Sequence, residues 1–183
     1  TLEEAAFELF AERGYAGTTV DDIAQRAGVS RNTFFNYFSA KSDVFWSEID
    51  DRLALLPGFL AATDPTLPAF RAIGEALADA AGSFGPENVP WILTQYELIG
   101  SPAEVQASAL SRFGAQAEVL RQFAAERLGQ HPGELLPRVI AYTTVGAVLA
   151  AAQAWAAAGP GRGPLTAHLV RTLAPLADGF TSS

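Results

Sequence analysis

A tight turn beginning at Gly28 separates two short helical patterns and constrains the fold of this chain more than any other feature. Gly28 supplies the left-handed backbone conformation of such a turn, and Ser30 is a suitable N-cap for the helix that follows. Before the turn, Thr19 is placed to cap a helix in which Asp22 reaches back from the third position. Two short helices that meet at a glycine turn predict a helix-turn-helix over about residues 19–38.

The apolar residues on either side of this motif predict how it is packed. A preceding helix, which ends at Gly14, carries an apolar stripe at helical spacing, formed by Leu2, Ala5, Ala6, Leu9 and Phe10. In the helix after the turn, Phe34 and Phe38 share one face, because successive residues are rotated by about 100°. We therefore expect Phe34 and Phe38 to pack on the two earlier helices as core.

The opposite face of the same helix is polar and suits contact with DNA bases. It carries Asn32 and Asn36, with Thr33 on one side and Phe35 on the other. Asparagine pairs with adenine through two hydrogen bonds, and an apolar ring can meet a thymine methyl group. Tyr37 lies at the margin of this face, where its hydroxyl can reach a phosphate. A purely structural three-helix unit is the alternative interpretation.

The contacts expected to the DNA backbone come from hydroxyls, cations and the free amides at helix starts. They are assigned to Thr18, Thr19, Ser30, Arg31, Ser39 and Lys41.

Composition limits the kinds of function that are possible. The net charge of −8 over 183 residues argues against a protein that coats nucleic acid by charge alone, so any DNA contact has to be local. The absence of cysteine excludes disulfides and thiolate metal sites. His131 and His168 have no second histidine at helical spacing, and no nucleophile–base arrangement stands out. We expect neither an enzyme nor a metal or other cofactor.

Beyond Lys41 the sequence predicts helices punctuated by proline and glycine, which makes the fold all-α. The first of these helices is expected to kink or end at Pro57 and Gly58, so that residues 56–58 form a hinge. Ser101, Pro102 and Glu104 form a capping box for a long helix. The further helices are expected over 64–83, a short stretch within 85–100, 102–128, 134–158 and 165–178. We expect a DNA-binding module over residues 1–46 and a ligand-binding and dimerisation module over 47–183.

Aromatic and polar residues are mixed in the middle helices. Ordinary core is the simpler interpretation for any one ring, but together such residues are also typical of an apolar ligand cavity. The candidate ligand-binding residues are Phe84, Asn88, Trp91, Gln95, Tyr96, Arg112, Phe113, Gln116 and Phe123.

Small residues along the helix expected over 134–158 allow a second helix to approach closely. This candidate dimer surface, paired with the last helix, comprises Gly146, Ala147, Ala150, Ala151 and Ala154, with Trp155 sealing its end. Burial within one protomer is the alternative. The stretch from Thr143 to Gly159 is too short and too weakly apolar for a membrane span, so we interpret it as a packed helix.

The run TTVDDIAQRAGVSRNTFFNYFSAKSDVF resembles the N-terminal module of the TetR family of bacterial transcriptional regulators, without a gap from Phe7 to about Trp46. The resemblance implies a cytoplasmic homodimer that binds a palindromic double-stranded DNA operator and pairs through its last two helices. The sequence departs from the family pattern at Asn32, Phe35 and Tyr37, where Gly, Tyr and His are frequent. The missing hydroxyl at Phe35 puts one phosphate contact in doubt.

Three further segments, RNTFFNYFSAKSDVFW, ELIGSPAEVQASALSRF and AAAQAW, are similar to an actinobacterial subgroup with an acyl-CoA-like ligand-binding C-terminal domain, which includes regulators of mycofactocin genes. This resemblance implies a repressor released by a long-chain acyl thioester, with Arg112 or Arg121 meeting the phosphates of that effector. Two alternatives stay open. The effector is a drug-like apolar molecule, or the chain is a helical small-molecule carrier without specific DNA binding.

Overall fold

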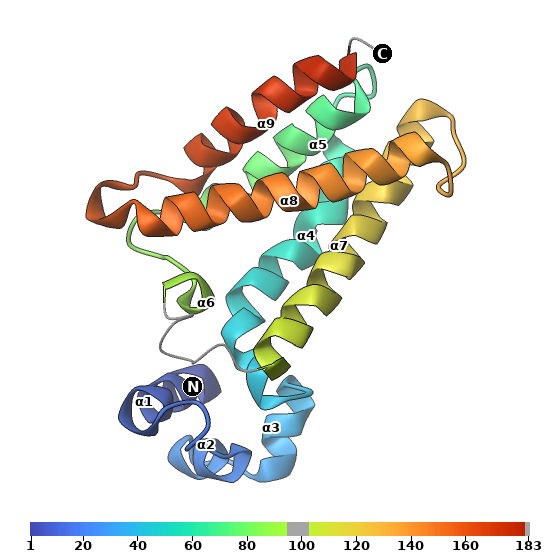
Figure 1. Ribbon diagram of the computed structural model, residues 1–183. Coiled ribbons are helices and arrows are strands. Elements are labelled where there is room, and N and C mark those ends of the chain that lie inside the picture. The colour runs from blue at the N-terminus through green and yellow to red at the C-terminus, as the bar shows by residue number, and fades with distance from the viewer. Residues whose placement is uncertain (95–102, 182–183) are drawn as a thin grey trace. The chain divides into compact units, whose positions relative to one another are not determined.

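The computed structural model describes residues 1–94 and 103–181, and every regular element in these two stretches is a helix (Figure 1). The all-α fold class predicted from the sequence is therefore confirmed.

The chain divides into two compact units, each made of two segments. Unit 1 comprises Thr1–Asp50 and Pro90–Leu110, and unit 2 comprises Asp51–Val89 and Ser111–Ser183. The division falls inside two helices, α4 (Ser47–Ala62) and α7 (Ala103–Leu128). Each of these helices therefore belongs partly to both units.

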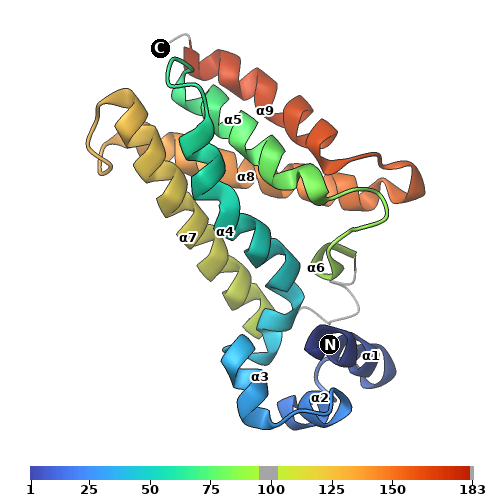
Figure 2. The same ribbon diagram turned by 180° about the vertical axis from the view of Figure 1, so that it is seen from behind.

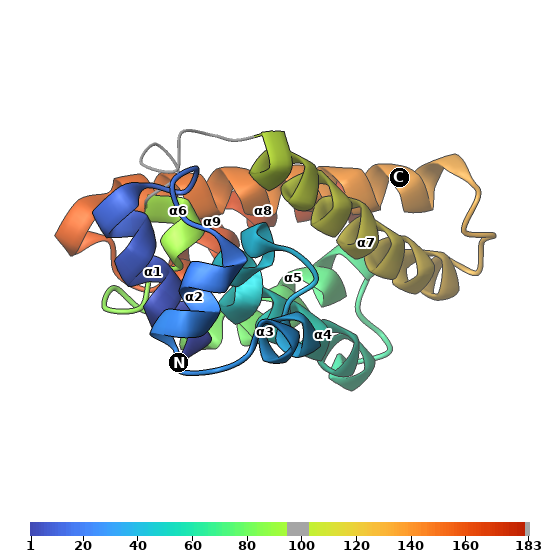
Figure 3. The same cartoon turned by 90° about the horizontal axis from the view of Figure 1, so that it is seen from below.

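Unit 1 contains the helix-turn-helix. The motif consists of α2 (Val20–Arg26) and α3 (Arg31–Tyr37), and the unit also contains α1 (Leu2–Arg13), the 3-10 helix η1 (Lys41–Trp46) and α6 (Trp91–Thr94). In Figure 3, α2 lies between α1 and α3, in agreement with its contacts to both. The five residues of the stripe predicted for α1 are all buried, which confirms that helix face.

Aromatic rings form much of the core of unit 1. Phe34 and Phe38 are buried, as predicted. Phe7 stacks on Trp91, with ring centroids 4.6 Å apart, so α6 packs against α1. The indole N–H of Trp46 donates to the Ser108 hydroxyl over 2.9 Å. Residues beyond position 90 thus complete the core around the helix-turn-helix.

Unit 2 is a helical layer around α9. Besides the parts of α4 and α7 that belong to it, the unit contains α5 (Ala69–Ala80), η2 (Ala81–Ser83), α8 (Leu135–Ala157), η3 (Gly159–Gly161) and α9 (Leu165–Thr181). Both α5 and α8 pack against α9 (Figures 1 and 2). Trp155 is fully buried at the end of α8 and donates its indole N–H to the Gly163 carbonyl over 2.8 Å.

Two predicted helix boundaries in unit 2 are wrong. The helix expected to kink or end at residues 56–58 does not end there. It continues through Pro57 to Ala62, because Leu56 and Leu60 are buried on both sides of the proline and hold the helix together.

The helix α5 begins at Ala69, not at Asp64 as expected. The Asp64 carboxylate accepts hydrogen bonds from the backbone N–H and the hydroxyl of Thr66, at 2.8 and 2.7 Å, and so forms a turn. Pro68 then disfavours a helical conformation in the residue before it. The helices α7, α8 and α9 begin within one residue of their expected starts. Ser101 and Pro102 of the predicted capping box lie outside the described residues.

Candidate nucleic-acid interface and effector pocket

The two short helices of unit 1 are fixed by the caps that the sequence predicts. Gly28 has a φ of 70°, in the left-handed region that favours glycine. The Ser30 hydroxyl accepts the Thr33 N–H over 3.0 Å at the start of α3. At the start of α2, Thr19 and Asp22 form a reciprocal capping box. The hydrogen bonds from Thr19 hold the pKa of the Asp22 carboxyl below its ordinary value.

The outward side of α3 carries four solvent-exposed side chains, which we call the reading face: Asn32, Phe35, Asn36 and Tyr37. Phe35 is 44% exposed although it follows fully buried Phe34, and Tyr37 is 74% exposed although it precedes buried Phe38. Thr33 is half-buried, and its hydroxyl lies 2.9 Å from the Ser30 hydroxyl. The structure therefore presents a mixed polar and aromatic surface on a helix whose other side is locked into the core.

Two residues assigned to DNA-backbone contacts are occupied inside unit 1. Thr18 has no exposed surface, and its hydroxyl donates to the Leu9 and Gly14 carbonyls at 3.2 and 2.9 Å. Its side chain therefore cannot reach a phosphate in this structure, and this part of the sequence interpretation is corrected.

Lys41 is held in a similar way. Its amine donates to the Tyr15 and Thr18 carbonyls at 2.7 and 2.8 Å, and it lies 3.9 Å from the centroid of the Tyr15 ring. Burial lowers the pKa of the Lys41 amine and raises that of the Tyr15 hydroxyl. The Lys41 side chain fastens the loop after α1 to the start of η1, instead of extending into solvent.

Arg31, at the first position of α3, is exposed and paired. Its guanidinium donates to the Asp21 carboxylate over 2.8 Å and lies 5.3 Å from the centroid of the Phe35 ring. Both partners of the ion pair are more than half exposed. Pairs of this kind contribute at most about 1 kcal/mol, so Arg31 can exchange this partner for another anion. The sequence interpretation did not include Asp21.

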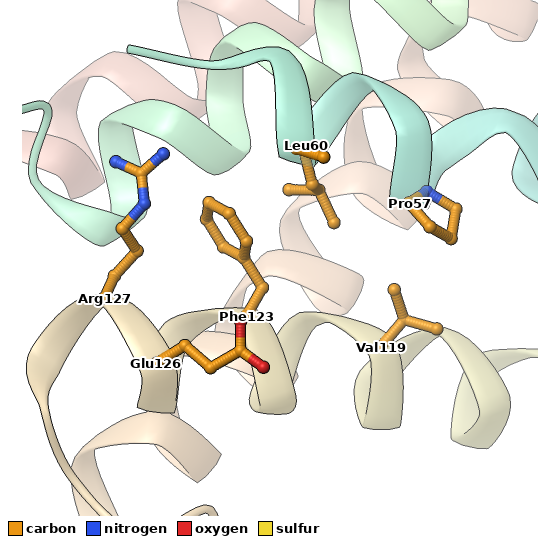
Figure 4. Close-up of a pocket in the computed structure, with 7 residues that line it drawn as sticks. Pro57, Leu60, Val119, Phe123, Glu126 and Arg127 are labelled. Atoms are coloured by element: carbon orange, nitrogen blue, oxygen red, sulfur yellow. The ribbon is translucent and has the colours of Figure 1, made fainter. Parts of the chain in front are cut away.

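Unit 2 contains a cavity of about 360 Å³ between the second half of α4 and the C-terminal part of α7 (Figure 4). Its apolar lining includes Leu60 from one side and Val119 and Phe123 from the other. Figure 4 shows the Leu60 and Phe123 side chains directed toward the space between the two helices. The cavity is open to solvent, and Glu126 and Arg127 add polar groups to its apolar lining.

Arg127 closes the end of this cavity. Its guanidinium lies 4.9 Å from the centroid of the Phe123 ring and donates to the Thr63, Asp64 and Leu67 carbonyls and the Thr63 hydroxyl, at 2.7 to 3.3 Å. These bonds join α7 to the turn after α4. A second cavity of about 280 Å³ lies on the other side of Arg127, with Leu136 and Ile140 of α8 in its lining.

The predicted ligand-binding residues are not gathered in one place. Phe123 lines the cavity, whereas Phe84 is buried where its carbonyl accepts the Leu165 N–H, and Trp91 belongs to the core of unit 1. Asn88 is exposed, Arg112 and Phe113 are half-buried, and the Gln116 side-chain oxygen is buried without a hydrogen-bond partner. Gln95 and Tyr96 lie outside the described residues.

The sequence interpretation did not identify Leu60, Val119 and Arg127 as pocket residues. Val119 and Phe123 recur four residues apart on α7, which is the signal that marks a shared helix face. Arg121, considered as a phosphate ligand, donates to the Glu118 carboxylate and to the Pro132 carbonyl.

The predicted dimer surface on α8 is largely open to solvent. Gly146, Ala150 and Ala154 are exposed and Ala147 is half-buried, but Ala151 is buried inside unit 2 and is not available to a second protomer. The exposed side extends to three larger apolar residues, Leu135, Val139 and Tyr142.

The length and composition of α8 would also allow it to span a membrane. The mean hydropathy of an 18-residue window is 1.6, and 28% of that window is buried. Core helices of water-soluble proteins have the same properties, so this feature alone is weak evidence of a membrane.

A helix-turn-helix with a polar outer face, joined to an all-helical unit that holds an apolar cavity, defines a DNA-binding regulator class. Comparison with known families identifies the family within this class to which the chain belongs. Residues 2–46 match the model of bacterial regulatory proteins of the tetR family, and residues 67–181 match the MftR C-terminal domain. The chain therefore belongs to the TetR family, with an MftR-type C-terminal domain, as the sequence resemblance indicated.

Individual relatives agree with this assignment. The chain is 30% identical over 154 residues to a Mycobacterium tuberculosis protein named as a regulator of mycofactocin biosynthesis, MftR, covering 84% of this chain and 77% of that protein. Among solved structures, Thermus thermophilus FadR, a repressor crystallised with lauroyl-CoA, is 24% identical with a TM-score of 0.57 and coverage of 97% and 92%.

A third similar protein is Pseudomonas aeruginosa NalD, a repressor of the MexAB-OprM multidrug efflux pump. It is 22% identical, with a TM-score of 0.62 and coverage of 97% of this chain and 93% of that one.

TetR-family proteins are transcriptional regulators that bind operator DNA as dimers, and the family is not enzymatic.

Proposed function

We propose that this chain is a dimeric repressor that binds a palindromic operator through α3 and is released by an apolar effector bound between α4 and α7. The observation that carries the DNA-binding part is the reading face, because exposed Asn, Phe and Tyr side chains lie on a helix anchored by Phe34 and Phe38. In this function, residues 1–46 form the DNA-binding module and residues 47–183 form the ligand-binding and dimerisation module.

The roles within the reading face follow from its chemistry. Asn32 and Asn36 hydrogen-bond base edges, and Phe35 contacts a thymine methyl group. Tyr37, Thr19 and the amides at the start of α3 contact phosphates. In a dimer, two copies of α3 enter successive major grooves, roughly 35 Å apart. The exposed side of α8, containing Gly146, Ala150 and Ala154, together with α9 forms the dimer surface.

The cavity between α4 and α7 is the proposed effector site. Its volume of about 360 Å³ and its Leu60, Val119 and Phe123 lining suit an apolar group. The complex of Thermus thermophilus FadR with lauroyl-CoA supports a long-chain acyl thioester. The efflux-pump regulator NalD supports a drug-like apolar effector as the second candidate.

Chain continuity connects this site with the DNA-binding module. Val105 and Ser108, in the first turns of α7, belong to unit 1, where Val105 is fully buried in the core and Ser108 accepts the Trp46 indole N–H. An effector that prefers a different packing of α4 and α7 thereby changes the orientation of the two DNA-binding modules in the dimer. The required preference is modest, because coupling energies between allosteric sites are typically about 1 to 3 kcal/mol.

The effector assignment is tested by measuring release from operator DNA and thermal stabilisation with lauroyl-CoA, palmitoyl-CoA and a panel of hydrophobic antibiotics. We expect Val119→Phe, which fills the cavity, to keep operator affinity but to reduce the response to the effector at least about tenfold, because bulk replaces ligand volume. Leu110→Phe, at an exposed position on the same helix, is the matched control. A full response in Val119→Phe would place the effector elsewhere.

A further inference from the structure

Every cationic side chain of the DNA-binding module is held by a partner within the module. Residues 1–46 contain four Lys and Arg side chains against seven Asp and Glu side chains. The four pairings are Arg13 with Asp22, Arg26 with Glu8 and Glu12, Arg31 with Asp21, and Lys41 with two backbone carbonyls. Attraction to the phosphate backbone, which dominates sequence-blind DNA binding, is therefore weak in this module.

One of these pairs lies beside the reading face. Arg31 starts α3 and lies against the Phe35 ring, and its carboxylate partner Asp21 lies in the first turn of α2. Both side chains are mostly exposed, so the pair can open when a phosphate replaces the carboxylate. Arg26, in contrast, is held by two carboxylates at 2.8 to 3.0 Å, and Lys41 is half-buried.

We propose that Asp21 is a specificity-determining residue. In sequence-blind complexes Asp21 stays paired with Arg31 and keeps it from phosphates. Arg31 leaves Asp21 for a phosphate only when the reading face is in register with the operator. This inference rests on the proposed DNA-binding function. In a sequence-blind complex no base contacts fix the position of α3, so a phosphate is not held close enough to displace Asp21. In the cognate complex, base contacts of Asn32 and Asn36 hold a phosphate at Arg31, and the pair exchanges.

The test compares Asp21→Asn with Glu8→Gln, measuring affinity for the selected operator and for random-sequence DNA over a range of salt concentrations. Glu8→Gln makes the same change in charge on the same module but leaves Arg26 bonded to Glu12 and leaves the Arg31 pair intact. We expect Asp21→Asn to raise affinity for random DNA about tenfold and to steepen the slope of log K against log salt by about one per protomer. Operator affinity rises less, so the ratio of the two affinities falls.

Two further variants decide whether Asp21 acts through Arg31. Asp21→Glu, which keeps the carboxylate, should restore the wild-type ratio, and Asp21→Asn in an Arg31→Gln background should give only the small rise seen with Glu8→Gln. Equal effects of Asp21→Asn and Glu8→Gln, or a tenfold rise that persists without Arg31, would overturn the inference. Wild-type protein that selects no DNA sequence would instead overturn the proposed function, on which the inference depends.

Discussion

The two units of this molecule stabilise their helices in different ways. Unit 1 surrounds three short helices with stacked rings, including the Phe7–Trp91 and Phe10–Phe45 pairs, whose centroids are 4.6 and 4.9 Å apart. Unit 2 relies on longer helices with small side chains, since eight of the 23 residues of α8 are alanine. It also contains the cavities of about 360 and 280 Å³.

This difference matches two functional demands. A surface that discriminates between bases needs a fixed helix, and bulky interlocked rings provide one because they leave few alternative packings. A site that responds to an effector needs space and helices that can repack, and the cavity between α4 and α7 provides the space. Under the proposed function, the two units thus combine a fixed reading surface with a ligand site between helices.

The largest expected effect is a difference in stability between variants of a buried and an exposed ring on α3. Phe34→Ala removes a fully buried ring and should lower the free energy of unfolding by about 3 to 5 kcal/mol. Phe35→Ala, at the next position, should change it by less than about 0.5 kcal/mol but weaken operator binding. Urea unfolding and operator titration of both variants check this. Similar losses of stability in the two variants would show that α3 is not divided into a core face and a reading face.

A second variant tests base recognition itself. Asn36→Ala should leave the fold intact and reduce discrimination at one base pair of each half-site by about 1 to 3 kcal/mol. Gln122→Ala, at an exposed position on α7, is the control. The measurement is competition between operators that differ at single positions. Unchanged discrimination would mean that a different face enters the groove.

A smaller loss of stability is expected when one cation in each unit is replaced. Lys41 and Arg127 both donate to backbone carbonyls, so Lys41→Met and Arg127→Met should each lower stability by about 1 to 2 kcal/mol. Only Lys41→Met should weaken operator binding, because it loosens the frame of α3. Its salt slope should remain that of the wild type. A slope of log K against log salt that is lower by about one unit would show that Lys41 contacts a phosphate.

Local signals explain which features the sequence could predict. The caps at Thr19 and Ser30 and the burial of Phe34 and Phe38 depend on residues a few positions apart, and all of these predictions are confirmed. The helix end considered at Pro57 fails for the opposite reason, since local preference disfavours a helix there that buried leucines maintain.

Long-range contacts explain most of what the sequence did not predict. Lys41 finds its acceptors 23 and 26 residues earlier, and Arg127 finds its acceptors 60 to 64 residues earlier. Such partners are known only once the helices are packed. For the same reason, the aromatic residues of the middle helices were expected to gather in one cavity, whereas Phe84, Trp91 and Phe123 lie in three different environments.

The most direct test of the central claim is selection of genomic DNA by the protein at two salt concentrations, followed by sequencing of the bound fragments. The account predicts that one short inverted repeat is recovered at both concentrations and that an effector of the α4–α7 cavity releases it. Binding that is sequence-blind and disappears with salt, or no binding at all, would contradict the account and favour a small-molecule carrier.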